Sequence, residues 1–217
     1  MPAYKNYHGW ITLDYDISVK SAKRQSDHID NYQSKELNDA LAYCTQFRTA
    51  IDIGAHIGII SFQLSKKFKS VHSFEIDTDV FECLKQNMQS KTSNVNLHNF
   101  GIGDTERSVD LKKTAKTFST HVIHNSIGSY KIKSLDQLNI TDIDFIKIDA
   151  EGFEPLIAKG SLKTIEKYKP IILYERKNHP QRYGFERDSL LEILTPLGYK
   201  MLKKLGRGEK NAVIGVV

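Results

Sequence analysis

Two glycines and an acid near residue 55 form the stretch of this sequence with the clearest chemical meaning. Asp52 lies in a short apolar run that ends at Gly54, and Gly58 opens a second apolar stretch with helical spacing. This pattern predicts a buried strand, a tight turn and a helix, and such a turn presents free backbone N–H groups to a ligand. The residues expected to form this binding turn are Asp52, Gly54, Ala55, His56 and Gly58.

The spacing of this turn indicates which ligand it suits. Asp-x-Gly-x-x-x-Gly differs from the Gly-x-Gly-x-x-Gly fingerprint of dinucleotide-binding proteins. An acid so close to the turn repels a pyrophosphate but suits a ligand that carries a cationic amine. S-adenosylmethionine (SAM) has such an amine and no phosphate, so we expect SAM here, with Asp52 orienting its ammonium group. His56 tolerates a positive φ better than most residues, so the turn is feasible, and an ordinary strand–helix turn is the alternative.

A second acid, Glu75, ends the next apolar run at the separation that one βαβ unit requires. An acid at the end of the second strand is where an adenosine ribose presents its two hydroxyls, so Glu75 and the adjacent Ile76 are expected to contact the cofactor. Gly103 and Asp104 follow the third predicted strand, and their small loop suits an adenine ring. The alternatives are a helix-capping acid at the first position and a plain turn at the second.

The candidate catalytic residues follow the fourth and fifth predicted strands. Asp149 and Glu151 come directly after one apolar run, and Glu175 ends the next, with His179 four residues later. Asp149 is also expected to contact the cofactor. Because open α/β sheets place their chemistry at the carboxyl ends of strands, we expect these side chains to meet there. Gathering carboxylates at one point is unfavourable unless a ligand, a metal ion or hydrogen-bond donors offset it.

The sequence leaves the role of a metal ion open and favours a metal-free site. A divalent cation held by these acids is the alternative. It is less favoured because no histidine joins the acids at a clear ligand spacing. His121 and His124 are three residues apart, but the β-branched residues around them favour a loop or strand over a helix. A loop that faces the substrate is the preferred interpretation of that segment.

The periodicity of apolar residues predicts strands that alternate with helices, followed by a terminal hairpin. Together these elements predict a seven-stranded, mostly parallel sheet with one antiparallel strand, in a single α/β domain over residues 31–217. Residues 1–30 are expected to form an arm or hairpin packed on that domain. The predicted strands are 50–53, 71–76, 94–100, 143–148, 170–176, 199–205 and 212–217, and the predicted helices are 30–47, 58–67, 79–89, 154–165 and 189–197.

Length and composition fit one globular domain that works in a reducing compartment. The chain has 217 residues, 40% of them hydrophobic and 26% charged, with a formal net charge of +5 that permits an anionic substrate without requiring one. It has no apolar run long enough to span a bilayer and no signal-peptide pattern, so no membrane contact is expected. Cys44 and Cys83 are far apart in helix-like segments, which favours a cytoplasmic location.

Five segments taken together resemble the FkbM family of SAM-dependent methyltransferases. The segments are 51–58, 74–75, 135–136, 146–154 and 170–175, with Gly-Ala-His in the first turn and Asp-x-Glu-Gly after the fourth strand as the distinguishing features. The resemblance implies a class I, Rossmann-like three-layer sandwich with strand order 3-2-1-4-5-7-6. It also implies O-methylation, often of a sugar or natural-product hydroxyl.

By the family pattern, one set of residues lines the cofactor site and three acids face the active site. This chain has Ile76 where many members carry proline, and the N-terminal arm and residues 105–130 match nothing specific. The cofactor set is Asp52, Gly54, His56, Gly58 and Glu75, and the active-site acids are Asp149, Glu151 and Glu175.

The sequence therefore predicts an O-methyltransferase that acts on a small molecule or glycan. A nucleic-acid methyltransferase is the less favoured alternative, because Asp149-Ala150-Glu151-Gly152 is not the Asp/Asn/Ser-Pro-Pro-aromatic signature of the amino-group enzymes. A non-catalytic nucleotide-binding module is less favoured again, because acids are retained at three strand ends. The oligomeric state is left open.

Overall fold

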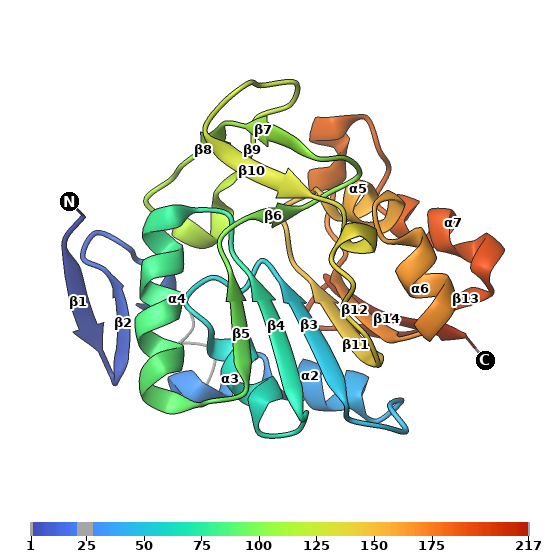
Figure 1. Ribbon diagram of the computed structural model, residues 1–217, viewed down its shortest axis with the longest axis horizontal. Coiled ribbons are helices and arrows are strands. Elements are labelled where there is room, and N and C mark those ends of the chain that lie inside the picture. The colour runs from blue at the N-terminus through green and yellow to red at the C-terminus, as the bar shows by residue number, and fades with distance from the viewer. Residues whose placement is uncertain (1, 21–27, 217) are drawn as a thin grey trace.

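The computed structural model describes residues 2–20 and 28–216, which form a mixed α/β fold around one central sheet (Figure 1). The sheet has seven strands in the order β13-β14-β12-β11-β3-β4-β5. Counted along the chain from the β5 edge, this is the order 3-2-1-4-5-7-6, so the predicted topology is confirmed. The strands are β3 (Thr49–Ile53), β4 (Ser70–Phe74), β5 (Val95–His98), β11 (Ile143–Ile148), β12 (Ile171–Glu175), β13 (Tyr199–Leu205) and β14 (Asn211–Val216).

The direction of the strands also agrees with the prediction. Strands β11, β12, β3, β4 and β5 pair in parallel, whereas β14 runs antiparallel to both β12 and β13. Because β3, β4, β11 and β12 are parallel neighbours, the residues after their last positions meet at one edge of the sheet. This edge carries the acids that the sequence singled out.

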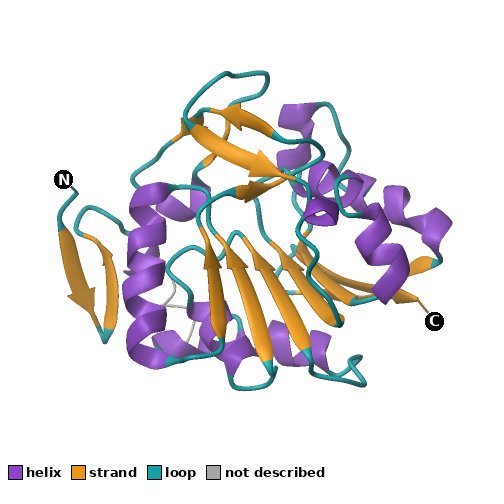
Figure 2. Ribbon diagram, viewed as in Figure 1, coloured by secondary structure: helices purple, strands orange, loops and turns teal. Residues whose placement is uncertain are grey.

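Alternating side chains give the sheet two apolar faces, and helices flank it (Figure 2). On one face, α2 and α3 pack over Ala50, Val71 and Phe145, and on the other, α5, α6 and α7 pack over Ile51, Ile146 and Ile172. Helix α4 covers α3 at one side of the sheet. The helices are α2 (Ser34–Leu41), α3 (Ile59–Ser65), α4 (Thr78–Lys91), α5 (Glu154–Lys159), α6 (Leu162–Tyr168) and α7 (Ser189–Leu194).

Three predicted helices are shorter than expected, each for a local reason. Helix α2 begins only after Gln33, which has a left-handed φ of 54°. The helix expected over 154–165 is divided into α5 and α6 at Gly160, where a Cβ would lie 1.8 Å from the carbonyl oxygen of Gly103. The last turn of the helix expected over 189–197 is the 3₁₀ helix η5 (Thr195–Leu197), which contains Pro196.

The N-terminal residues form a hairpin beside α4 (Figure 1). Its strands are β1 (Tyr4–Tyr7) and β2 (Trp10–Leu13), and the 3₁₀ helix η1 (Ile29–Asn31) precedes α2. Asn87 of α4 holds β2 through two hydrogen bonds with the backbone of Ile11, at 2.7 and 2.9 Å. The predicted division of the chain near residue 30 stays a prediction, because residues 21–27 lie outside the described residues.

Residues 101–138 form a small layer at the carboxyl edge of the sheet (Figure 1). Strands β6, β10 and β7 make a three-stranded sheet, and β8 pairs with β9. Within the described ranges, no helix is long and apolar enough to cross a membrane. The remaining elements are β6 (Gly101–Ile102), β7 (Arg107–Val109), β8 (Leu111–Lys112), β9 (His121–Val122), β10 (Tyr130–Lys133), η2 (Thr117–Ser119), η3 (Leu135–Gln137) and η4 (His179–Tyr183).

Candidate active site

A pocket opens where β3, β4 and β11 end, under the small layer of residues 101–138. The structure brings six of the ten predicted cofactor residues to its wall and leaves four outside it. The six in the wall are Gly54, Ala55, His56, Glu75, Ile76 and Asp149. The four outside are Asp52, Gly58, Gly103 and Asp104.

Gly54 is required by the close approach of two loops beneath the pocket. Its φ is +79°, and a Cβ at this position would lie 1.9 Å from the backbone oxygen of Asp149. The amide groups of Gly54 and Ala55 both donate to the carbonyl oxygen of Phe74, at 3.0 Å. Only glycine lets the turn after β3 meet the end of β11 at this distance.

The other two predicted glycines serve packing. A Cβ at Gly58 would lie 2.7 Å from atoms of Leu84 and Met88 on α4, and its φ of +97° starts α3. At Gly103 a Cβ would lie 2.7 Å from Ile132. Gly101 and Ile102, the two residues directly before Gly103 in the chain, line the pocket instead. Asp104 forms an ion pair with Arg107 at 2.6 Å and lies away from the pocket.

Asp52 is buried beneath the pocket and does not line it. Its Oδ2 accepts a hydrogen bond of 2.7 Å from the Ser61 hydroxyl, and burial raises the pKa of its carboxyl group. The strand explains this placement, because Asp52 alternates with Ile51 and Ile53 and so faces α3. Any influence of Asp52 on a ligand therefore passes through a neighbouring side chain.

Glu75 holds the turn after β3 and faces the pocket. Its Oε2 accepts from the amide of His56 at 2.9 Å, and its Oε1 accepts from the amide of Asp77 at 2.8 Å. Burial raises the pKa of Glu75 to about 7, although these backbone hydrogen bonds act in the opposite direction. Each oxygen retains a lone pair for a further donor.

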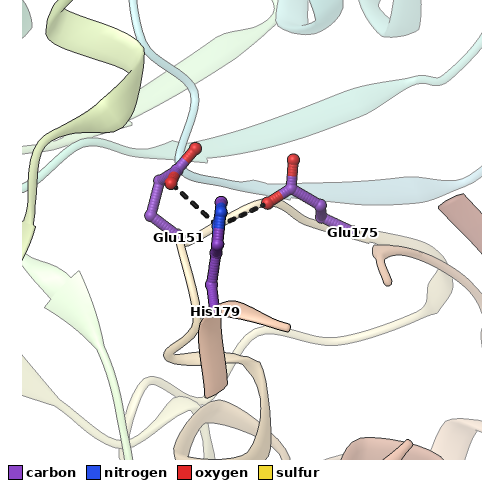
Figure 3. A group of neighbouring side chains, drawn as sticks. All are labelled: Glu151, Glu175 and His179. Carbon is purple, nitrogen blue, oxygen red and sulfur yellow. Dashed lines mark ion pairs between the residues drawn. The ribbon is translucent and has the colours of Figure 1, made fainter. Parts of the chain in front are cut away.

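Glu151, Glu175 and His179 come together at the ends of β11 and β12, as Figure 3 shows. The Nδ1 atom of His179 lies 3.0 Å from Oε2 of Glu151 and 3.4 Å from Oε2 of Glu175. The second oxygen of Glu175 pairs with the ammonium of Lys177. Burial, followed by the charges of Glu175 and Asp149, raises the pKa of Glu151 to about 7.

A second chamber adjoins this first pocket and has a volume of about 390 Å³. Asp149 and Glu151 line both spaces, so they stand at the junction. The second chamber continues past Glu175 and Lys177 to the turn between β13 and β14. A ligand in each space would thus meet its neighbour beside two carboxylates.

Residues 52–201 match the family profile described as the methyltransferase FkbM domain. The chain belongs to the FkbM methyltransferase family. This assignment agrees with the resemblance that the sequence motifs indicated, and it covers all the acids at the strand ends. A comparison with curated protein sequences finds no match.

Solved structures share the fold of this FkbM domain at low sequence identity. The methyltransferase FkbM from Methylobacillus flagellatus has 19% identity and a TM-score of 0.54, and the match covers 78% of this chain but 44% of that chain. A Streptococcus mutans protein solved in complex with S-adenosylhomocysteine (SAH) has 13% identity and a TM-score of 0.54, with 85% and 97% of the chains covered. The yhhF protein from Escherichia coli has 13% identity and a TM-score of 0.52, over 84% and 83%.

Lys147 is a residue of the FkbM domain that sequence reasoning missed. Its side chain is buried in β11 and lines the first pocket, with Nζ 3.3 Å from Asp149 and 3.7 Å from Asp52. Burial alone lowers the pKa of Lys147, but Asp149 and Asp52 outweigh it and raise the pKa above its ordinary value. One feature of the sequence could have identified Lys147: it is a lysine inside an apolar strand, between Ile146 and Ile148, which are both buried.

His56 belongs to a hydrogen-bonded network that ties the N-terminal arm to this FkbM domain. Its Nε2 lies 2.5 Å from the hydroxyl of Thr117, which donates to Asp16 at 2.8 Å. Because the Thr117 hydroxyl donates its hydrogen to Asp16, its oxygen acts as the acceptor in the contact with His56. We therefore place the imidazole proton of His56 on Nε2. Burial lowers the pKa of His56, which favours this neutral form. No local pattern in the sequence marked Asp16 or Thr117.

The two histidines of the 117–128 segment have separate positions. His121 lines the first pocket, and its Nδ1 lies 3.0 Å from the carbonyl oxygen of Ser119. His124 packs edge-on against the ring of Tyr183. That this segment faces the substrate stays a prediction, and strand β9 is a regular part of it.

Proposed function

We propose that this FkbM domain transfers the methyl group of SAM to a hydroxyl of a small molecule or glycan. The observation that carries the proposal is the pair of chambers that meet at Asp149 and Glu151. Such an arrangement sets a methyl donor on one side of two acids and an acceptor on the other. The acceptor chamber, at about 390 Å³, suits a sugar-sized group.

The cofactor pocket offers a partner for each part of SAM. Glu75 suits the ribose hydroxyls, because both of its oxygens retain accepting capacity after holding the turn. Ile76 and Ile102 offer an apolar wall for the adenine ring. Asp149, fixed by Lys147, suits the ammonium of the amino-acid tail, a role that the sequence assigned to Asp52.

The reaction needs little covalent help from the protein. The acceptor hydroxyl loses its proton, its oxygen forms the new bond to the methyl carbon, and the electrons of the broken carbon–sulfur bond stay on sulfur. Alignment of the two substrates therefore supplies most of the rate. A carboxylate at the junction adds deprotonation of the hydroxyl.

The same proposal includes the cellular location and the partners. Cys44 and Cys83 are free thiols, which supports a reducing, cytoplasmic setting. A small-molecule or glycan acceptor is proposed over a nucleic acid, because four acids outnumber the three basic residues Lys177, Arg207 and Lys210 in the wall of the acceptor chamber, which is therefore not a basic surface for a phosphate backbone. These acids are Glu36, Asp149, Glu151 and Glu175.

A screen of hydroxyl-bearing acceptors tests the proposal. Purified protein is incubated with SAM and panels of sugars, glycans and short RNAs, and released SAH is measured. Turnover with a sugar or small-molecule hydroxyl, giving a methyl ether by mass spectrometry, is the expected result. Methylation confined to RNA, or to a nitrogen atom, contradicts the proposal.

Replacing Glu75 with glutamine is expected to weaken SAH binding. The change removes the charge of a group assigned to the ribose, which corresponds to about 1–3 kcal/mol for a charge-assisted hydrogen bond. Asp104→Asn is the control, because Asp104 pairs with Arg107 outside the pocket. Calorimetric titration of both variants measures the effect, and equal affinities would remove Glu75 from the cofactor site.

The affinity for SAH is also expected to depend on pH through Glu75. Its pKa of about 7 means that the carboxylate forms as the pH rises through neutrality. Ribose hydroxyls stabilise the ionised form, so binding strengthens from pH 6 to pH 8 and weakens on acidification, by about three- to tenfold over this range. In Glu75→Gln the affinity should change less with pH than in the wild type, and Glu151, which also lines the pocket and has a raised pKa, accounts for the change that remains. Equal pH dependence in the two proteins contradicts the assignment.

A further inference from the structure

Three side chains that could ligate a cation point at one another beside the acceptor chamber (Figure 3). They are Glu151 after β11, Glu175 at the end of β12 and His179 at the start of η4. One ligand atom from each lies within 4.8 Å of the other two. Sequence reasoning favoured a metal-free site because no histidine joined the acids, and the structure places His179 between them.

The atoms at the centre of this cluster have unused bonding capacity. The side chain of Glu175 is nine-tenths buried, with 9% exposed, and Lys177 pairs with its Oε1 only. Within the described residues, neither Oε2 of Glu175 nor Nδ1 of His179 makes a hydrogen bond. Buried polar atoms are almost always partnered, and these two lie 3.4 Å apart inside the cluster, so one shared positive group would satisfy both.

The spacing of these atoms fits coordination by a metal ion. Ligand atoms about 2.1 Å from an octahedral ion lie about 3 Å from their neighbours. The observed separations from His179 Nδ1 are 3.0 Å to Glu151 and 3.4 Å to Glu175. We infer that Glu151, Glu175 and His179 bind a divalent cation, and that the mixed set of two carboxylate oxygens and one imidazole nitrogen selects Mn²⁺ over Mg²⁺.

The backbone holds the two loops together without help from an ion. Glu151 has a left-handed φ of 52°, and Gly152 follows with a φ of 107°. A Cβ at Gly152 would lie 2.5 Å from the carbonyl oxygen of His179, so glycine allows the loop after β12 to reach the loop after β11. Arg182 donates to the carbonyl oxygen of Glu151 at 3.0 Å. The ligands are therefore preorganised.

The site would act directly on the acceptor of the proposed reaction, and this consequence rests on the proposed function. Glu151 and Glu175 both line the acceptor chamber, so a cation held by them would lie beside an acceptor hydroxyl in that chamber. A bound divalent cation lowers the pKa of such a hydroxyl. The proton passes to Asp149 or solvent, and the oxygen then takes the methyl group while the carbon–sulfur electrons remain on SAH.

Manganese binding by the whole protein tests the inference without an acceptor. Chelator-treated protein is titrated with Mn²⁺ alone, and the free ion is followed by its electron paramagnetic resonance signal. Wild type is expected to bind one equivalent at submillimolar Mn²⁺. Glu175→Gln and His179→Ala should each weaken binding by about tenfold or more, because each removes a ligand. Glu192→Gln, an exposed acid on α7, should bind as wild type does.

Two results would overturn the cation site. One is a wild type that binds neither Mn²⁺ nor Zn²⁺, in which case a proton on His179 satisfies the two carboxylates. The other is unchanged Mn²⁺ affinity in both ligand variants. Circular dichroism establishes that each variant is folded, and SAH titration of the same samples separates the two ideas. Mn²⁺ binding without SAH binding rejects the proposed function and leaves the cation site standing.

Discussion

Replacing Gly54 with alanine is expected to abolish measurable SAH binding. The added Cβ would lie 1.9 Å from the backbone oxygen of Asp149, which no side-chain rotation can relieve. The turn after β3 and the end of β11 must separate, and the residues that line the pocket on both loops move with them. We expect the affinity to fall by about 100-fold or more, since shifts of about 1 Å have effects of that size.

Gly184→Ala is the matched control for this experiment. Gly184 also has a left-handed φ, of 78°, but its added Cβ would meet nothing within 4 Å. Both variants carry the same backbone strain, of about 1 kcal/mol, and only Gly54→Ala adds the collision. Binding is measured by calorimetry at a temperature where circular dichroism shows both proteins folded. Equal SAH affinity in the two variants would show that the approach of the two loops does not shape the pocket.

Glu151→Gln is expected to remove most methyl transfer and to leave SAH binding nearly intact. Glu151 lies at the junction of the two chambers, where a carboxylate either accepts the acceptor's proton or holds an ion that acidifies it. Glutamine has the same shape and does neither, so kcat should fall by about 10²- to 10⁴-fold. Arg182 donates a hydrogen bond to the Glu151 carbonyl oxygen, which the substitution retains, and its guanidinium lies 3.9 Å from Oε2 of Glu151, an ion pair that the substitution removes.

This second prediction is measured as SAH release with an acceptor found in the screen, beside a calorimetric titration with SAH. Asp142→Asn is the control, because Asp142 pairs with Arg48 at the opposite, amino end of β11. A folded Glu151→Gln protein with wild-type kcat contradicts the assignment of the junction acids. If the variant loses SAH affinity by the same factor as it loses kcat, Glu151 instead serves only to bind the cofactor.

The acids at the strand ends could be predicted from the sequence because parallel topology dictates where they meet. Once β3, β4, β11 and β12 are parallel neighbours, whatever follows their last residues gathers at one edge. Glu75, Glu151 and Glu175 reach the site for that reason. The sequence also predicted the strand order correctly, through the family resemblance and not through periodicity.

The residues that prediction misplaced are those whose role depends on what lies opposite them in space. Gly58 and Gly103 are glycines because Met88 and Ile132 leave no room for a Cβ, and no local pattern shows this. Asp52 was assigned to the ligand because it is near the turn, but strand alternation points its side chain toward α3 and away from the pocket. The contact between His56 and Thr117 joins residues 61 positions apart.

The assignment of this pocket to the methyl donor SAM is tested by titrating the wild-type protein with the reaction product SAH. We expect one SAH bound per chain, with no heat from NAD or NADP, because the turn at Gly54 lacks the pyrophosphate fingerprint and ends beside acids. The proton content of Glu75 should make the SAH affinity higher at pH 8 than at pH 6. Binding of a nicotinamide dinucleotide in preference to SAH, or no binding of SAH by folded protein, would contradict it.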